Sequence, residues 1–362
     1  MDENAIDETR RTFIGASAAV ISGAAMMGAG LSLSGPASAQ VSTGPAVLGF
    51  PNTNGVLVER VTFTSRNTRA RIVANLFKPA DSDPSRKYAA IVVTHPIGGV
   101  KEQTAGLYAM KLAENGFVTL AYDATFQGES GGEPHLLESP TARVEDISDA
   151  IDFLSAHPQV DANRIGSLGI CGGGGYVLNA AQFESRIRAV ATVSAADIGD
   201  LRRNGLANSR TYEERITLLR DAAAQRTREA HGEPVRLIPT VPETDDFTAS
   251  TPVMYREGYE YYRTARGQHP NAPARSVQSG LPAQMAFFAF EQLETISPRP
   301  VLLIAGAKAD SLYFSEMAYN KASEPKELFI VSGATHIDMY DKPEFVTPAV
   351  AKLQAYFSGH LD

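Results

Sequence analysis

The chain has 362 residues, of which 43% are hydrophobic and 20% charged, and this composition is that of a globular protein rather than of a disordered or fibrous chain. Its formal net charge is −8 at pH 7 and no basic run stands out, so we expect no nucleic-acid partner, because phosphate binding needs concentrated Lys and Arg. The single cysteine, Cys171, excludes an intramolecular disulfide and a Cys-rich metal site.

The first 39 residues have the pattern of an export signal. Arg10 and Arg11 form a twin-arginine pair, a weakly apolar stretch follows, and Ala37-Ser38-Ala39 is a small-residue cleavage site. Glycines and a proline interrupt the apolar stretch, which makes it a poor membrane-spanning helix. We therefore expect a signal peptide over residues 1–39, export by the Tat machinery, a periplasmic or secreted protein, and no stable membrane anchor.

After residue 40, short apolar runs alternate with amphipathic stretches, which is the pattern of a mostly parallel sheet flanked by helices. The run 89–94 is almost unbroken in its apolar character, as expected for a strand that is buried on both faces. In chain order, the predicted strands are 56–63, 71–77, 89–94, 117–122, 164–170, 187–194, 301–305 and 328–331. The predicted helices of this α/β part are 103–115, 141–155, 176–182 and 346–357.

This alternation stops between residues 197 and 296. Helices are predicted there at 212–230, 255–262 and 281–293, and the stretch 231–248 is rich in proline and irregular. An insertion between two late strands of a parallel sheet indicates a cap over the carboxyl ends of the strands, where ligands bind in such sheets. The predicted domains are a signal peptide (1–39), an α/β core (40–196 and 297–362) and a helical cap (197–296).

The strongest signal of a functional site is the glycine-rich turn around Cys171. Residues 169–173 read G-x-C-x-G between a predicted strand and a predicted helix, as in a nucleophile elbow, where small residues make room for a strained turn. A helix N-terminus at this point would favour the thiolate and lower the thiol pKa. The alternative is a buried structural cysteine.

Two other interpretations of glycine-rich segments are rejected. No frame of the segment around Cys171 gives G-x-G-x-x-G, so it is not a dinucleotide-binding loop. Residues 128–132 match G-x-S-x-G, but this segment lacks the strand–turn–helix context, and Ser130 is therefore expected to be an ordinary loop residue.

The other members of a catalytic triad are predicted from chain order and strand ends. Asp310 follows the strand 301–305 and His336 follows the strand 328–331, so both fall at the same sheet edge as Cys171, in the order nucleophile, acid, base. His336 would take the thiol proton and Asp310 would fix the imidazole tautomer. The oxyanion hole would consist of the backbone N–H groups of Gly172 and Ile97.

Some roles have alternatives. Asp338 and Asp341 are a second choice for the acid, and His95 could be a second base, although we expect it to pack beneath the site. The sequence contains no metal-ligand motif, so neither a metal nor a cofactor is expected. The aromatic side chains expected to bind the substrate are Phe126, Tyr262 and Phe288.

Four segments carry a family resemblance: residues 95–103, 261–264, 296–300 and 333–338. They resemble the α/β-hydrolase superfamily, and within it the YcjY-like branch, which is related to the dienelactone hydrolases. The elbow with Cys171 resembles that of dienelactone hydrolase, where a Cys-His-Asp triad opens an enol-lactone. The resemblance runs from about residue 56 to residue 357 and implies the α/β-hydrolase fold with an inserted cap.

The sequence thus predicts an exported, cofactor-free hydrolase that cleaves an ester, lactone or thioester of a small-molecule acyl substrate through an acyl-cysteine intermediate. Two alternatives stay open, which are an acyltransferase that uses the same triad and a non-catalytic ligand-binding homologue. The acyl group, the leaving group and the oligomeric state stay open as well.

Overall fold

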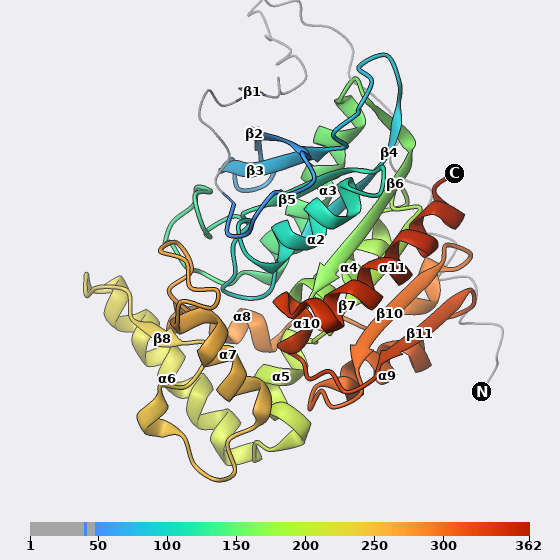
Figure 1. Cartoon of the computed structure of the whole chain (residues 1–362). Coiled ribbons are helices and arrows are strands. Elements are labelled where there is room, and N and C mark those ends of the chain that lie inside the picture. Colours follow the sequence, from blue (N-terminus) through green and yellow to red (C-terminus); the bar gives the residue numbers. More distant parts are fainter. Residues whose placement is uncertain (1–39, 42–47) are drawn as a thin grey trace, which may run out of the picture. The chain divides into compact units, whose positions relative to one another are not determined.

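The computed structural model describes residues 40–41 and 48–362 (Figure 1). The predicted signal peptide, residues 1–39, lies outside the described residues. The described residues all belong to one compact unit. None of the helices in the described residues combines the length and the apolar character needed to cross a membrane.

The described residues form a nine-stranded sheet in the order β1-β2-β3-β5-β4-β6-β7-β10-β11. The pairs from β1 to β5 are antiparallel, and the pairs from β5 through β11 are parallel, which confirms the predicted mostly parallel sheet. The strand bounds are β1 (Gln40–Val41), β2 (Leu57–Thr64), β3 (Arg71–Lys78), β4 (Tyr88–Thr94), β5 (Val118–Tyr122), β6 (Val160–Ile170), β7 (Ala189–Val193), β10 (Val301–Gly306) and β11 (Lys326–Val331).

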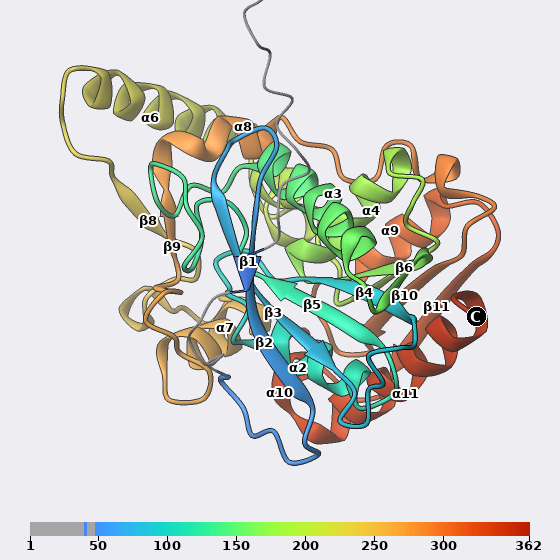
Figure 2. The ribbon, with the colours of Figure 1, turned by 90° about the horizontal axis from the view of Figure 1, so that it is seen from above.

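Helices cover both faces of this sheet (Figure 2). One hydrophobic cluster joins the sheet to α3 (Pro140–Ala156), α4 (Gly172–Phe183) and α9 (Leu312–Lys321), and a second cluster joins it to α2 (Thr104–Ala113) and α11 (Pro343–His360). Along β4, Val92 belongs to the first cluster and Val93 to the second. This alternation explains the unbroken apolar run, because successive side chains of a strand point to opposite faces.

The segment 197–296, called the cap below, holds most of the remaining elements. Its helices are α5 (Ile198–Asn204), α6 (Tyr212–Ala230), α7 (Val253–Arg263) and α8 (Leu281–Met285); its short 3₁₀ turns are η2 (Leu206–Asn208), η3 (Thr244–Asp246), η4 (Gln278–Gly280) and η5 (Leu293–Ile296). A two-stranded antiparallel ribbon of β8 (Leu237–Pro239) and β9 (Arg275–Val277) completes it. α10 (Asp338–Asp341) lies outside the cap, directly after β11.

Some predicted elements were wrong. The predicted helix 281–293 stops after α8, and the ribbon β8–β9 and the helices α5, α9 and α10 were not predicted. Beyond α8, backbone carbonyls accept hydrogen bonds from core side chains instead of continuing a helix. Asn179 donates to the carbonyl of Phe288 at 3.2 Å, and Gln182 donates to the carbonyl of Ala289 at 2.7 Å. Tertiary contacts therefore override the local helical pattern.

A buried ion network fixes the loop after β4, which holds Ile97. Lys101 is 1% exposed, and its Nζ lies 2.6 Å from Glu102, 2.8 Å from Asp123 and 2.7 Å from Glu129. The Lys101 backbone N–H also donates to Asp123 at 2.8 Å. Because Asp123 follows β5 directly, the network joins the loops after two neighbouring strands.

We predict that Lys101→Met lowers the free energy of unfolding by about 3–5 kcal/mol, because it leaves buried carboxylates without their counterion. The control is Lys111→Met, which removes a partly exposed contact to Glu114 at 3.0 Å and should cost under about 1 kcal/mol. Urea unfolding measures both, and equal losses in the two variants would contradict a structural role for the network.

Candidate active site

Cys171 occupies a strained turn between β6 and α4. Its φ of 55° and ψ of −124° lie in a region of backbone conformation that residues other than glycine rarely adopt. Its neighbours must be small: a Cβ on Gly169 would lie 2.2 Å from the carbonyl oxygen of Gly173, and a Cβ on Gly173 would lie 2.4 Å from that of Thr94. The backbone thus has the strand–turn–helix geometry of a nucleophile elbow, with the thiol at the start of α4.

His336 lies in the turn between β11 and α10 and is 1% exposed. Its Nδ1 is 2.5 Å from the Ser311 hydroxyl, and its Nε2 is 3.2 Å from the Tyr340 hydroxyl. The Tyr340 hydroxyl also acts on Cys171, because it lowers the pKa of the thiol. Within the described residues no direct hydrogen bond between Cys171 and His336 is found, but both residues line the same cavity as Tyr340, whose hydroxyl contacts the imidazole.

Asp310 follows β10 and faces the cap. Its Oδ2 accepts a hydrogen bond from the backbone N–H of Met254, in the first turn of α7, at 2.9 Å. In the part of the chain that the structure describes, its Oδ1 is buried without a hydrogen-bond partner, and no hydrogen bond joins the carboxylate to His336. The structure thus brings Asp310 to the predicted edge and leaves the imidazole contact to its neighbour, Ser311.

The residues considered as alternatives are engaged elsewhere. His95 is fully buried, and its Nε2 accepts a hydrogen bond from the backbone of Ala124 at 3.1 Å, as expected for a packing role. Ser130 donates to the carbonyl of Asp123 at 2.7 Å inside its loop. The second-choice acids form ion pairs, Asp338 with Lys342 at 2.5 Å and Asp341 with Arg266 at 2.6 Å.

Burial determines the protonation states of Cys171 and His336. It raises the pKa of the Cys171 thiol, although the nearby Tyr340 hydroxyl and the Gly172 backbone act in the opposite direction. This corrects the predicted lowering of the pKa, since desolvation of the thiolate outweighs the helix terminus here. Burial also lowers the pKa of His336 to about 4. At neutral pH the resting site therefore holds a neutral thiol beside a neutral imidazole.

The residues predicted for the oxyanion hole lie next to each other. A Cβ on Gly172 would lie 2.5 Å from the Ile97 side chain, so the loop after β4 packs directly against the start of α4. The Gly172 backbone also lowers the pKa of the Cys171 thiol. Both predicted donors therefore belong to segments that border the thiol.

A cavity of about 70 Å³ opens in front of Cys171. The core contributes Ile97, Cys171, His336 and Tyr340 to its lining, and the cap contributes Arg202, Met254, Tyr255 and Tyr262, among others. Of the aromatic residues predicted to bind substrate, only Tyr262 is brought to this cavity. Phe288 is 50% exposed and lies over the Arg203 guanidinium, and the Phe126 ring lies against Gly132 in the loop after β5.

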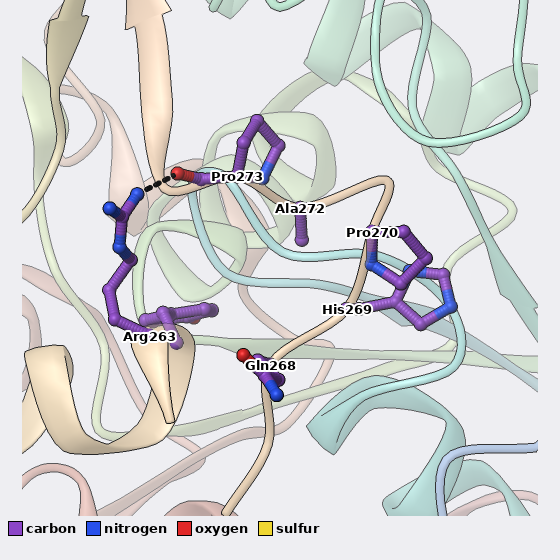
Figure 3. A pocket seen from close by; sticks show the side chains of 7 residues that line it. Arg263, Gln268, His269, Pro270, Ala272 and Pro273 are labelled. Atoms are coloured by element: carbon purple, nitrogen blue, oxygen red, sulfur yellow. Dashed lines mark hydrogen bonds between the residues drawn. The ribbon is translucent and has the colours of Figure 1, made fainter. Parts of the chain in front are cut away.

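A second, more open cavity of about 630 Å³ lies beside the cap (Figure 3). It is lined by Tyr262, Arg263, Gln268, His269, Pro270, Ala272 and Pro273. Arg263 donates to the carbonyl of Pro273 at 2.8 Å and so closes one side of this loop (Figure 3). Tyr262 belongs to the lining of both cavities.

Among the described residues, one group of carboxylates has the spacing of a metal site: Glu102, Asp123 and Glu129. The Lys101 ammonium contacts all three within 2.8 Å. A cation of this chain therefore already occupies the centre of the group, and the cluster serves as the structural network described above.

The fold and the elbow define the class of protein. The family model for the dienelactone hydrolase family matches residues 72–195, which include the elbow. The chain belongs to this family of α/β hydrolases and has the α/β-hydrolase fold.

Three relatives place it more closely. Protein YcjY of Escherichia coli is 41% identical over 304 residues, which cover 83% of this chain and 99% of YcjY. The crystal structure of PA2218 from Pseudomonas aeruginosa superposes with a TM-score of 0.81 at 36% identity, over 89% of this chain and 99% of that one. A thiohydrolase of Eupenicillium brefeldianum is 26% identical over 275 residues, which cover 74% of this chain and 85% of the relative.

We predict that Cys171 reacts with iodoacetamide with a titration midpoint above that of an unperturbed thiol, about 8.5, because burial disfavours the thiolate. The chain has a single cysteine, so intact mass reports this residue alone. The same protein unfolded in urea is the reference. A midpoint in the folded protein below that of the unfolded protein would show an activated thiolate instead.

Proposed function

We propose that this protein hydrolyses an ester or thioester through an acyl-enzyme on Cys171. The observation that carries the proposal is the thiol at the strained elbow, which lines one cavity together with a buried imidazole and the hydroxyl that contacts this imidazole. Membership of the dienelactone hydrolase family supports the reaction class. The twin-arginine pattern supports export, and the proposed location is the periplasm or the exterior.

The proposed reaction has two halves. In the first, the Cys171 sulfur attacks the carbonyl carbon while the thiol proton passes to His336, and the backbone N–H groups of Gly172 and Ile97 bind the oxyanion. The tetrahedral intermediate collapses, and the imidazolium returns its proton to the departing oxygen or sulfur. In the second half, His336 deprotonates water, which attacks the acyl carbon; the carbon–sulfur bond breaks, the imidazolium returns the proton to the Cys171 sulfur, and the carboxylic acid is released.

A neutral resting pair suits this scheme. A neutral imidazole can accept a proton, and the pKa of about 4 keeps His336 neutral over the physiological range. The imidazolium that forms during attack needs a partner at Nδ1, and we assign this role to Asp310 acting beside Ser311. The buried Oδ1 of Asp310 is an acceptor still available for it.

The cavity also favours a class of acyl group. Its lining is mostly apolar, but it includes the guanidinium of Arg202, on α5. Among the described residues, no carboxylate lies within ion-pair distance of Arg202, which donates instead to the Gln284 side chain at 3.0 Å. An acyl chain that carries a carboxylate would supply the missing counterion, because arginine binds carboxylates through paired donors.

The proposal is tested by incubating the purified chain with a panel of p-nitrophenyl esters, thioesters and lactones. Intact mass should show an adduct of the acyl mass on the wild type and none on Cys171→Ala, which should lose turnover. Product analysis separates a hydrolase from an acyltransferase, because the hydrolase releases the free acid in water. Absence of an adduct across the panel, or full activity of Cys171→Ala, would overturn the proposal.

We predict that Asp310→Asn lowers kcat by at least about 10²-fold, because an acid that orients the catalytic histidine is worth about this much or more. Ser311→Ala, which removes the hydroxyl at Nδ1, should cost less than about tenfold. Steady-state kinetics on the fastest panel substrate decides between them. The opposite order would make Ser311 the orienting residue and leave Asp310 as an anchor of α7.

We predict that Arg202→Met lowers kcat/KM for a p-nitrophenyl hemisuccinate by about tenfold or more relative to the neutral p-nitrophenyl butyrate, since one charge-assisted contact is worth roughly 1.5–3 kcal/mol. Arg203→Met is the matched control, because Arg203 donates to the carbonyls of Met285 and Phe287 outside the cavity lining. An unchanged ratio of the two substrates in Arg202→Met would show that this cation does not select the acyl group.

A further inference from the structure

Tyr340 stands at the centre of the polar contacts of the site. Its hydroxyl is 3.2 Å from His336 Nε2, and Tyr340 lines the same cavity as Cys171. A hydroxyl can accept one hydrogen bond while it donates another, so it can carry a proton between two groups that do not touch each other. Both neighbours are the groups between which the proposed reaction moves a proton.

The position of this hydroxyl is fixed from several sides. The Tyr340 ring is 1% exposed and packs edge-on against Tyr261, with ring centroids 5.2 Å apart. The backbone of the same turn is held from α2, where Thr104 donates to the carbonyl of Tyr340 at 3.0 Å and Tyr108 donates to that of Met339 at 2.8 Å. The phenol therefore belongs to the rigid part of the site.

The imidazole tautomer follows from its two contacts. If Nδ1 carries the hydrogen and donates to Ser311, then Nε2 is the acceptor and faces the Tyr340 hydroxyl. Burial keeps the pKa of Tyr340 well above its usual value, so the phenol stays protonated between turnovers. In this tautomer the Tyr340 hydroxyl donates to Nε2, and its oxygen can accept a hydrogen bond from the thiol.

We propose that Tyr340 is a catalytic residue, whose hydroxyl accepts the proton of the Cys171 thiol and passes its own proton to His336 Nε2 as the carbon–sulfur bond forms. The proposal rests on the acyl-cysteine function proposed above. One S–H bond and one O–H bond break, and one O–H bond and one N–H bond form. The electron pair that the S–H bond leaves on sulfur makes the new bond to carbon. The tyrosine ends unchanged and the imidazole ends as imidazolium.

The direct test is Tyr340→Phe, which keeps the ring and removes the hydroxyl. The acylation rate constant, measured as the burst of p-nitrophenol from p-nitrophenyl acetate, should fall by at least about 10²-fold, the lower end for proton-transfer catalysis. KM should change less than about threefold. Tyr122→Phe is the matched control, because it removes another buried hydroxyl, 3.2 Å from Thr94, outside the site.

A second measurement separates proton transfer from positioning. In mixtures of H₂O and D₂O, acylation by the wild type should depend on the deuterium fraction along a curve, since two protons move together. If Tyr340→Phe fails to fold, 3-fluorotyrosine in place of Tyr340 keeps the shape and lowers the phenol pKa. The acylation rate should then change while KM and melting temperature stay as in the wild type.

The outcomes are distinct. Wild-type acylation in Tyr340→Phe, or a linear isotope dependence in the wild type together with no effect of 3-fluorotyrosine, would overturn the relay and leave the acyl-cysteine function standing. A loss in Tyr340→Phe that Tyr122→Phe shares, with an equal fall in melting temperature, would also overturn it. If the wild type forms no acyl-enzyme on Cys171, both proposals fall, because no thiol proton is transferred.

Discussion

The close approach of backbones at the elbow is the constraint on which the rest of the site depends. Gly169 and Gly173 leave no room for a Cβ, and this contact holds Cys171 at a φ of 55° with its thiol above the sheet edge. The loops after β4, β10 and β11 all begin at this edge, because the carboxyl ends of parallel strands lie at the same edge of the sheet. The tight turn thus fixes the position of the Cys171 thiol, and the other groups of the site are arranged around it.

The same burial that builds the site sets its electrostatic state. Desolvation disfavours both the thiolate and the imidazolium, so the resting pair is neutral and charge would separate only during the proposed attack. Charge that develops in a site of low dielectric needs fixed dipoles nearby, which the start of α4 and the Gly172 backbone supply at the sulfur. A low thiol pKa is therefore not required for reactivity here, provided that a route for the proton exists.

The sequence predicted the sheet and the edge but not the contacts within the site. Asp310 and His336 could be placed because strand ends and chain order follow from periodicity. The direction of the Cys171 pKa shift was wrong because a helix terminus is visible in a sequence, whereas the burial that outweighs it is not. Tyr340 lies four residues after His336, a spacing that one helical turn would bring together, but the short α10 gave no periodic signal. Arg202 could not be found, since which side of α5 faces the cavity depends on the packing of the cap.

The Asp310 carboxylate joins the cap to the candidate active site. Asp310 accepts its hydrogen bond from the first turn of α7, and α7 also carries Tyr262, which lines both cavities. A cavity of about 70 Å³ has room for only a few water-sized groups, so a larger acyl chain needs α7 or Tyr262 to move. A shift of α7 away from the core would break the bond from Met254 and leave both oxygens of Asp310 without a partner, beside the residue that contacts His336. Admission of substrate and support of the imidazolium would then depend on the same displacement, which is a physical reason for a helical cap to contact the proposed triad acid directly.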